Sequence, residues 1–121
     1  MADEENVDTG NPDVFTIFEG QYDIALMDNC TMDNASTMLT VMCVVCIMSD
    51  AVLTGYSDGE AFATLAPECC PDESIKLPVF FDDSVVALGI GTDGTMTATG
   101  ASGDGTLHLE GICFNNCDRW Y

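Results

Sequence analysis

The chain has 121 residues, of which 47% are hydrophobic, and it carries 21 acidic side chains against two basic ones, Lys76 and Arg119. This length is typical of one domain with one hydrophobic core. The formal net charge of −19 excludes a basic patch, so we expect no binding to nucleic acid and no attraction to an anionic membrane surface. Repulsion within such an acidic particle is reduced by salt or by bound cations.

The amino-terminal residues 1–12 are rich in Asp and Glu and poor in apolar side chains. They predict a flexible acidic arm, which either frays or orders against a neighbouring subunit, followed by a single β-rich domain over residues 13–121. No basic segment followed by an apolar one begins the sequence as given, so no secretory signal peptide is recognised.

Two short strands are predicted after the arm, at Val14 to Phe18 and at Tyr22 to Met27. In the second, the alternation places Tyr22, Ile24 and Leu26 on one face, as expected for a half-buried hairpin.

The stretch from Met38 to Met48 is apolar at nearly every position. Its valines and Ile47, together with Thr40 and the preceding Thr37, favour a central strand, whereas its methionines and Leu39 favour a helix, and we predict the strand. At 11 residues the stretch is shorter than the roughly 20 residues that a spanning helix needs, so no membrane insertion is expected.

Residues Leu77 to Phe114 carry the clearest β pattern, because apolar segments are interrupted by Asp93-Gly94 and Asp104-Gly105. Asp-Gly is a strong hairpin signal, since tight turns need positive φ values. We predict consecutive antiparallel strands that turn at both pairs, with the last strand running from Thr106 to Phe114. The fold class that follows is all-β: a small antiparallel β-sandwich or a barrel-like domain.

Seven cysteines are a large number for this length, and three interpretations remain open: a disulfide framework, buried reduced thiols, or a structural metal site. The odd count leaves at least one thiol outside any intramolecular pair. A framework of disulfides predicts an oxidising or extracellular location. The cysteines are Cys30, Cys43, Cys46, Cys69, Cys70, Cys113 and Cys117.

The spacings favour some pairs over others. Cys43 and Cys46 point to opposite faces of a strand and are predicted not to bridge each other. Cys113 and Cys117 flank Asn115-Asn116, which forms tight turns readily, so these two sulfurs are predicted to lie close together. Adjacent cysteines need separate partners, because a bond between them distorts the peptide that joins them. The disulfide candidates are therefore Cys113, Cys117, Cys69, Cys70 and Cys30.

The sequence holds no recognisable catalytic motif, and we expect that the chain is not an enzyme. His108 is its only histidine and lies in Leu-His-Leu-Glu-Gly, which is typical of the exposed face of a strand. No cofactor is expected, except that aspartates at strand ends are typical ligands of Ca²⁺. The candidate metal ligands are Asp82, Asp83, Asp93 and Asp104.

The carboxyl terminus offers candidate interface residues, Arg119, Trp120 and Tyr121, because aromatic side chains and Arg are enriched at the centres of protein interfaces. The alternative is that the two aromatic side chains fold back onto their own core. The expected partners are protein subunits, either copies of this chain or a shell or tail protein. Deletion of residues 119–121 separates these two interpretations.

These observations favour a non-enzymatic structural protein of a larger assembly, most narrowly a decoration, cement or tail-associated protein of a virus or phage particle. It would be located on the virion or on another extracellular surface. One alternative is a secreted or cell-surface adhesion or ligand-binding module that is stabilised by disulfides and binds calcium. A further alternative is a cytosolic zinc-binding interaction module.

Overall fold

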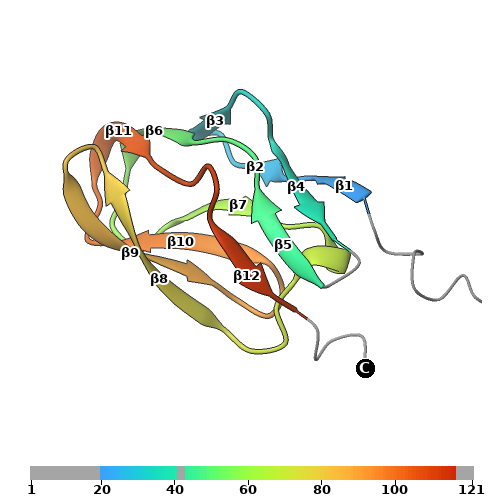
Figure 1. Ribbon diagram of the computed structural model, residues 1–121. Helices are drawn as coiled ribbons and strands as arrows, with labels where there is room; N and C mark the ends of the chain where they lie inside the picture. Colours follow the sequence, from blue (N-terminus) through green and yellow to red (C-terminus); the bar gives the residue numbers. More distant parts are fainter. Residues whose placement is uncertain (1–19, 41–42, 117–121) are drawn as a thin grey trace, which may run out of the picture.

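The computed structural model describes residues 20–40 and 43–116, and these residues form an all-β fold (Figure 1). No helix within these ranges has the length and apolar character needed to cross a membrane. The predicted arm, residues 1–12, and the predicted strand Val14 to Phe18 lie outside the described residues. The elements are β1 (Gly20–Asp23), β2 (Ala25–Leu26), β3 (Cys30–Met32), β4 (Ser36–Leu39), β5 (Val44–Ile47), β6 (Ala51–Tyr56), β7 (Ala61–Thr64), the 3₁₀ turn η2 (Pro67–Cys69), β8 (Ile75–Phe81), β9 (Ser84–Ile90), β10 (Thr95–Thr99), β11 (Gly103–Leu107) and β12 (Cys113–Asn115).

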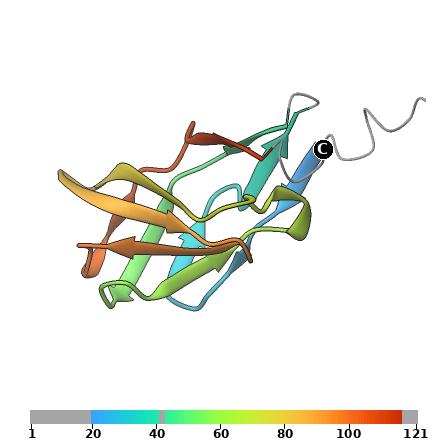
Figure 2. The same ribbon diagram turned by 90° about the horizontal axis from the view of Figure 1, so that it is seen from below.

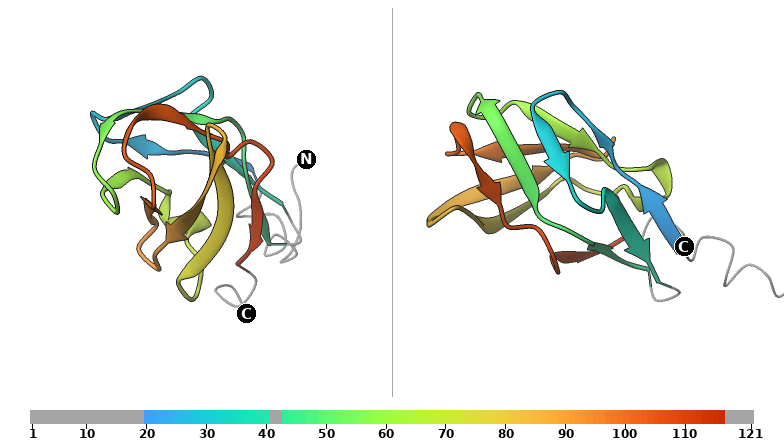
Figure 3. Two further views of the ribbon diagram at one scale, coloured as in Figure 1. Left: turned by 90° about the vertical axis from the view of Figure 1, so that its left-hand side faces the viewer. Right: turned by 90° about the horizontal axis from the view of Figure 1, so that it is seen from above.

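The strands form two antiparallel sheets. The larger has the order β2-β7-β10-β9-β8-β11-β6-β3 and curls nearly into a barrel, as the end-on view in Figure 3 shows. The smaller has the order β1-β4-β5-β12. Within the larger sheet, β8, β9 and β10 are consecutive neighbours and β11 lies beside β8, which is the Greek-key order. The predicted fold class, a small antiparallel β-sandwich or barrel-like domain, is confirmed.

Both sheets contribute to one core. Phe62, Leu88 and Leu107 of the larger sheet are fully buried together with Leu39 and Val45 of the smaller sheet. Burial of such side chains is the main favourable term in the folding free energy. The core therefore fixes which face of each strand remains available to solvent.

The alternation predicted for Tyr22 to Met27 is confirmed, because Ile24 is buried and Tyr22 and Leu26 are partly buried against the same core, but the single strand predicted there is divided into β1 and β2. The chain passes from the smaller sheet to the larger at Ile24: β1 pairs with β4, and β2 pairs with β7. One continuous apolar face therefore serves both sheets.

The single strand predicted from Met38 to Met48 is wrong, because this stretch forms two antiparallel strands, β4 and β5, with Thr37 opposite Ile47. The backbone N–H of Cys43 donates to the carbonyl of Thr40 at 2.9 Å, and Cys43 has a positive φ of 63°. The sequence hides this reversal, since Thr-Val-Met-Cys contains none of the residues that favour turns.

The turn predicted at Asp93-Gly94 is confirmed between β9 and β10. Gly94 has a φ of 87°, and its N–H donates to the carbonyl of Gly91 at 2.9 Å. The backbone N–H of Thr95 donates to Oδ1 of Asp93 at 3.0 Å, and this hydrogen bond lowers the pKa of the Asp93 carboxyl. The Asp and the Gly therefore each have a separate structural task in this turn.

The turn predicted at Asp104-Gly105 is wrong, because both residues lie inside β11 and the chain reverses before them. The Asp104 side chain accepts the backbone N–H of Gly55, on the neighbouring strand, at 2.7 Å. A Cβ on Gly105 would lie 2.6 Å from the Phe81 ring, so the glycine permits a close approach of strands. β11 consequently pairs with β6 and β8, and not with β10.

The strand predicted from Thr106 to Phe114 is also wrong. β11 ends at Leu107, and the N–H of Ile112 donates to the carbonyl of Leu109 at 2.9 Å, which closes a tight turn before β12 begins. Beyond this turn, Cys113 is exposed and Phe114 is buried. The break moves the carboxyl-terminal strand from the larger sheet to the smaller one.

Candidate functional site

The outer face of β8, β9 and β10 is the candidate site; these strands, coloured yellow to orange, lie side by side (Figure 2). Alternation directs every second side chain of each strand to solvent. Phe80 on β8 and Val85 on β9 are directly opposite in register and are 53% and 65% exposed. Their neighbours Phe81 and Val86 point into the core. Two large apolar side chains therefore stand together on the surface.

Beside Phe80 and Val85 the same face is hollowed. Pro78, Ala87 and Thr99 form one lateral row, since Pro78 is opposite Ala87 and Ala87 is opposite Thr99. The small Ala87 side chain in the middle of this row leaves a shallow depression. It is lined by Lys76, Leu77, Pro78, Val85, Val86, Ala87 and Thr99.

Opposite charges mark the two ends of this face. Lys76, at the start of β8, is the only lysine or arginine in the part of the chain that the structure describes. Asp82 and Asp83 form the tight turn between β8 and β9, and both are exposed. Asp82 has a φ of 52°, and its Oδ1 accepts the backbone N–H of Thr106 at 3.0 Å. This hydrogen bond holds the acidic turn against β11.

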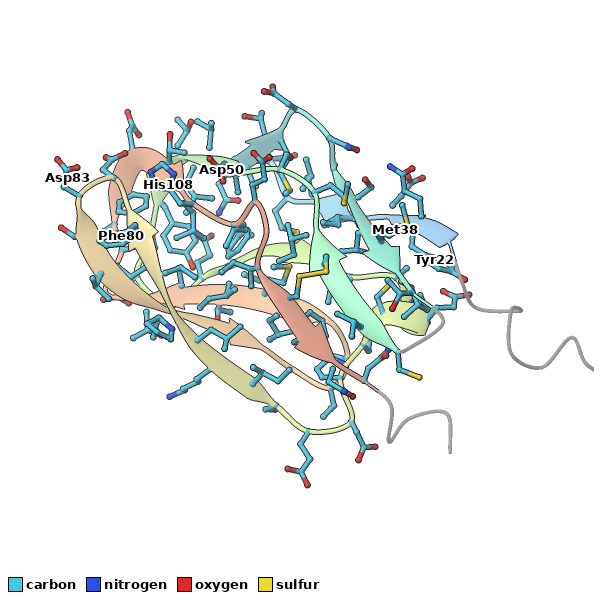
Figure 4. All side chains as sticks on the ribbon, viewed as in Figure 1. Tyr22, Met38, Asp50, Phe80, Asp83 and His108 are labelled. Carbon is cyan, nitrogen blue, oxygen red and sulfur yellow. A yellow bond between two sulfur atoms is a disulfide. The ribbon has the colours of Figure 1, made fainter. Side chains whose placement is uncertain are left out.

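His108 and Asp50 lie next to Phe80, and Figure 4 shows these residues and Asp83 at the same end of the molecule. The backbone N–H of His108 donates to the carbonyl of Phe80 at 2.9 Å. Its Nδ1 is 3.3 Å from Oδ2 of Asp50, while Oδ1 of Asp50 accepts the backbone N–H groups of Leu109 and Glu110 at 2.9 Å. Asp50 therefore orders the chain beyond β11, and His108 is exposed as predicted.

The four candidate metal ligands do not form one site. Asp82 and Asp83 lie at one end of β9 and Asp93 at the other, about 23 Å away for a seven-residue strand. Asp82, Asp93 and Asp104 each accept a backbone N–H through a carboxylate oxygen. Within residues 20–40 and 43–116, no three His, Cys, Asp or Glu side chains are grouped to hold a metal ion. These four aspartates therefore do not make up a shared calcium site.

The disulfide joins Cys46 of β5 to Cys113 of β12, which are directly opposite in register with a Cα–Cα distance of 4.1 Å. The disulfide candidates named from the sequence included Cys113 but not Cys46, which is 67 residues away along the chain. Cys43 and Cys46 do not bridge each other, as predicted. Cys117, the predicted neighbour of Cys113, lies outside the described residues.

The disulfide candidates Cys30 and Cys69 are buried thiols that form no disulfide, and the candidate Cys70 is also buried. The core accommodates all three as small apolar side chains, and of the interpretations left open by the sequence, buried reduced thiols describe Cys30 and Cys69. Burial raises the pKa of the Cys30 thiol to about 11 and also raises that of Cys69, whose Sγ lies 3.1 Å from Oγ1 of Thr37. Thiols in such surroundings are poor nucleophiles near neutral pH.

The interface candidates Arg119, Trp120 and Tyr121 lie outside the described residues. Phe80 is one of the aromatic residues that a shallow sheet was expected to leave partly exposed, whereas Val85 was not singled out from the sequence. Their alternation was visible in the sequence, but it did not show which of Phe80 and Phe81 faces outward. The surface that the structure offers is a mixed apolar and charged face on a sheet.

Neither a protein-family model nor a curated protein matches the sequence.

Proposed function

We propose that this chain is a non-enzymatic structural subunit of a larger protein assembly and that it docks through the outer face of β8, β9 and β10. The observation that carries the proposal is the pair Phe80 and Val85, which are the two most exposed large hydrophobic side chains in the part of the chain that the structure describes. Apolar and aromatic side chains that gather on a surface are typical of protein contact sites.

The charge supports a protein as the partner. A net charge of −19 repels nucleic acid phosphates and anionic lipid surfaces, whereas a protein surface can offer both apolar contacts and basic groups. The most specific form of the proposal is a decoration, cement or tail-associated protein of a virus or phage particle. A compact sheet with an external disulfide suits an exposed position on such a particle.

The native mass of the protein, measured by size-exclusion chromatography of extracts from cells that make it, tests this proposal. The wild-type chain is expected to elute in a complex far larger than a monomer or a dimer. Phe80→Ser with Val85→Ser should release it as a folded monomer, whereas Met27→Ser, at a 45% exposed apolar residue elsewhere, should leave the complex intact. Elution of the wild-type chain at the mass of a monomer or dimer at every concentration contradicts the proposal.

A secreted or cell-surface module is the second candidate, and the Cys46–Cys113 disulfide is the observation that favours it. Disulfides persist in oxidising compartments and are rare in the cytosol. Peptide mapping of natural material without reductant, combined with its location, distinguishes the two functions. An oxidised monomer in the medium supports the secreted module, and oxidised protein within a particle supports the structural subunit.

A further inference from the structure

We propose that the outer face of β8, β9 and β10 binds a second copy of this chain across a two-fold axis, with the two β8 strands antiparallel. This inference rests on the proposed function, since it names the first partner of the same surface. Two-fold interfaces use one patch on both subunits, so the patch has to complement itself after a rotation of 180°. The outer face fulfils this requirement in charge and in shape.

The charges of β8 and its turn are arranged about a centre at Val79. Lys76 lies three residues before this centre, and Asp82 lies three residues after it, with Asp83 next in the same turn. A two-fold axis through the centre places Lys76 of each copy opposite the acidic turn of the other. Two equivalent attractive contacts therefore form at the two ends of one interface.

The protruding and hollow parts of the outer face are also arranged about the centre at Val79. Pro78 and Phe80 are one residue before and one residue after Val79, on the exposed face of β8. The axis therefore places the protruding Phe80 of one copy over the hollow beside Pro78 and Ala87 of the other. Insertion of an aromatic side chain into a preformed hollow is a frequent anchor of protein interfaces.

The rest of the described surface disfavours other orientations. Two copies each carry a charge of −19, and Lys76 is the only Lys or Arg within residues 20–40 and 43–116. An orientation that leaves Lys76 outside the contact brings acidic side chains together. The orientation with Lys76 against Asp82 and Asp83 supplies two attractive contacts related by the two-fold axis.

The contact between the two copies is small, so we expect weak dimerisation. A face of three strands is about 15 Å wide and about 20 Å long, so each copy buries less than the roughly 800 Å² typical of a stable partner surface. The pair is therefore expected to form at high protein concentration and to be strengthened inside an assembly, where neighbouring contacts raise the effective concentration.

Charge reversal in the purified full-length chain tests the geometry by sedimentation velocity over a concentration series. At about 0.1 M salt the Debye length is about 10 Å, so contacts between neighbouring charges remain distinguishable. The wild type is expected to dimerise with increasing concentration. Lys76→Glu and Asp83→Lys should each weaken dimerisation by at least about tenfold, because each places like charges opposite one another.

The equimolar mixture of the two variants is the decisive sample. In a mixed pair the carboxylate introduced by Lys76→Glu faces the ammonium group introduced by Asp83→Lys, while the second contact keeps its natural residues. A heterodimer is therefore expected at near wild-type affinity. The mixed pair has the same total charge as the wild-type pair, which excludes an effect of net charge alone. Circular dichroism of each variant checks that both remain folded.

The matched control is Asp33→Lys, which makes the same charge change in the exposed turn between β3 and β4, and it should not weaken dimerisation. A wild-type chain that stays monomeric, or a mixture that associates no better than its components, overturns the antiparallel pair. If native material still elutes as a large complex that Phe80→Ser with Val85→Ser disrupts, the proposed function stands and only this partner is rejected.

Discussion

Cys46 and Cys113 lie opposite each other on β5 and β12 and are joined by a disulfide across a sequence separation of 67. The bond fastens the short edge strand β12 to the smaller sheet. It also closes a long loop that contains β6 to β11. Most of the larger sheet therefore folds within a covalently closed segment.

Removal of this disulfide is predicted to lower the free energy of unfolding by about 2–4 kcal/mol, because the unfolded chain regains the entropy of an open loop. Cys46→Ala with Cys113→Ala should show this loss in urea denaturation. The wild type treated with a reductant should approach the double variant. Equal stability of the oxidised wild type and the double variant would contradict the prediction.

Gly94→Ala is predicted to destabilise the protein more than Gly59→Ala. Both glycines have positive φ values, which costs an alanine about 1–2 kcal/mol. Only at Gly94 would the new Cβ also meet packed atoms, at 2.8 Å from Sγ of Cys70 and 2.9 Å from the Leu65 carbonyl oxygen, whereas Gly59 faces open space. The difference, about 1–3 kcal/mol, is measurable by urea denaturation, and equal losses would count against the close approach.

Cys30 is predicted to make stability depend on alkaline pH. Burial raises the pKa of its thiol from 9.0 to about 11, so the folded state holds this proton more tightly than the unfolded state does. The stabilisation is complete below pH 9 and is lost as the pH rises towards about 11. The free energy of unfolding should therefore fall more steeply over this interval in the wild type than in Cys30→Ala, and parallel curves would refute the assignment.

The β class and the turn at Asp93-Gly94 followed from the sequence because local chemistry determines them. Asp93-Gly94 combines a residue that accepts a neighbouring N–H with one that adopts positive φ at little cost. The face formed by Tyr22, Ile24 and Leu26 was predictable because it depends only on a period of two. These features persist whatever sheet the strands later join.

The remaining features depend on contacts between distant parts of the chain. The reversal between Thr40 and Cys43 uses no typical turn residue, so only pairing of β4 with β5 reveals it. Gly105 resembles a turn glycine in sequence, but its role is to let β11 approach Phe81. The partner of Cys113 and the outward direction of Phe80 likewise depend on the complete strand order, which local patterns do not determine.

Phe80 and Phe81 are adjacent, and truncation of Phe81 is predicted to destabilise the protein far more than truncation of Phe80. Phe81→Ala should cost about 3–5 kcal/mol, because the ring is buried in the core. Phe80→Ala should cost about 1 kcal/mol or less, since the ring is 53% exposed. Chemical denaturation of both variants measures the difference, and similar losses would show that the outer face is assigned to the wrong residue.

The last prediction concerns Asp50, whose carboxylate contacts both the chain after β11 and His108. Asp50→Ala removes the acceptor of the Leu109 and Glu110 N–H groups and should cost about 1–2 kcal/mol, because the Leu109 group is partly buried. His108→Ala should cost less than about 1 kcal/mol, since the ion pair is exposed and solvent screens it.

Asp50→Asn supplies the matched control for this site, because its amide oxygen can still accept the two N–H groups while the charge opposite His108 is removed. Its stability should lie close to that of the wild type if Asp50 acts as a backbone acceptor. If Asp50→Asn loses as much stability as Asp50→Ala while His108→Ala loses equally, the contact with His108 carries the effect. Urea denaturation of the three variants and the wild type under the same conditions separates these outcomes.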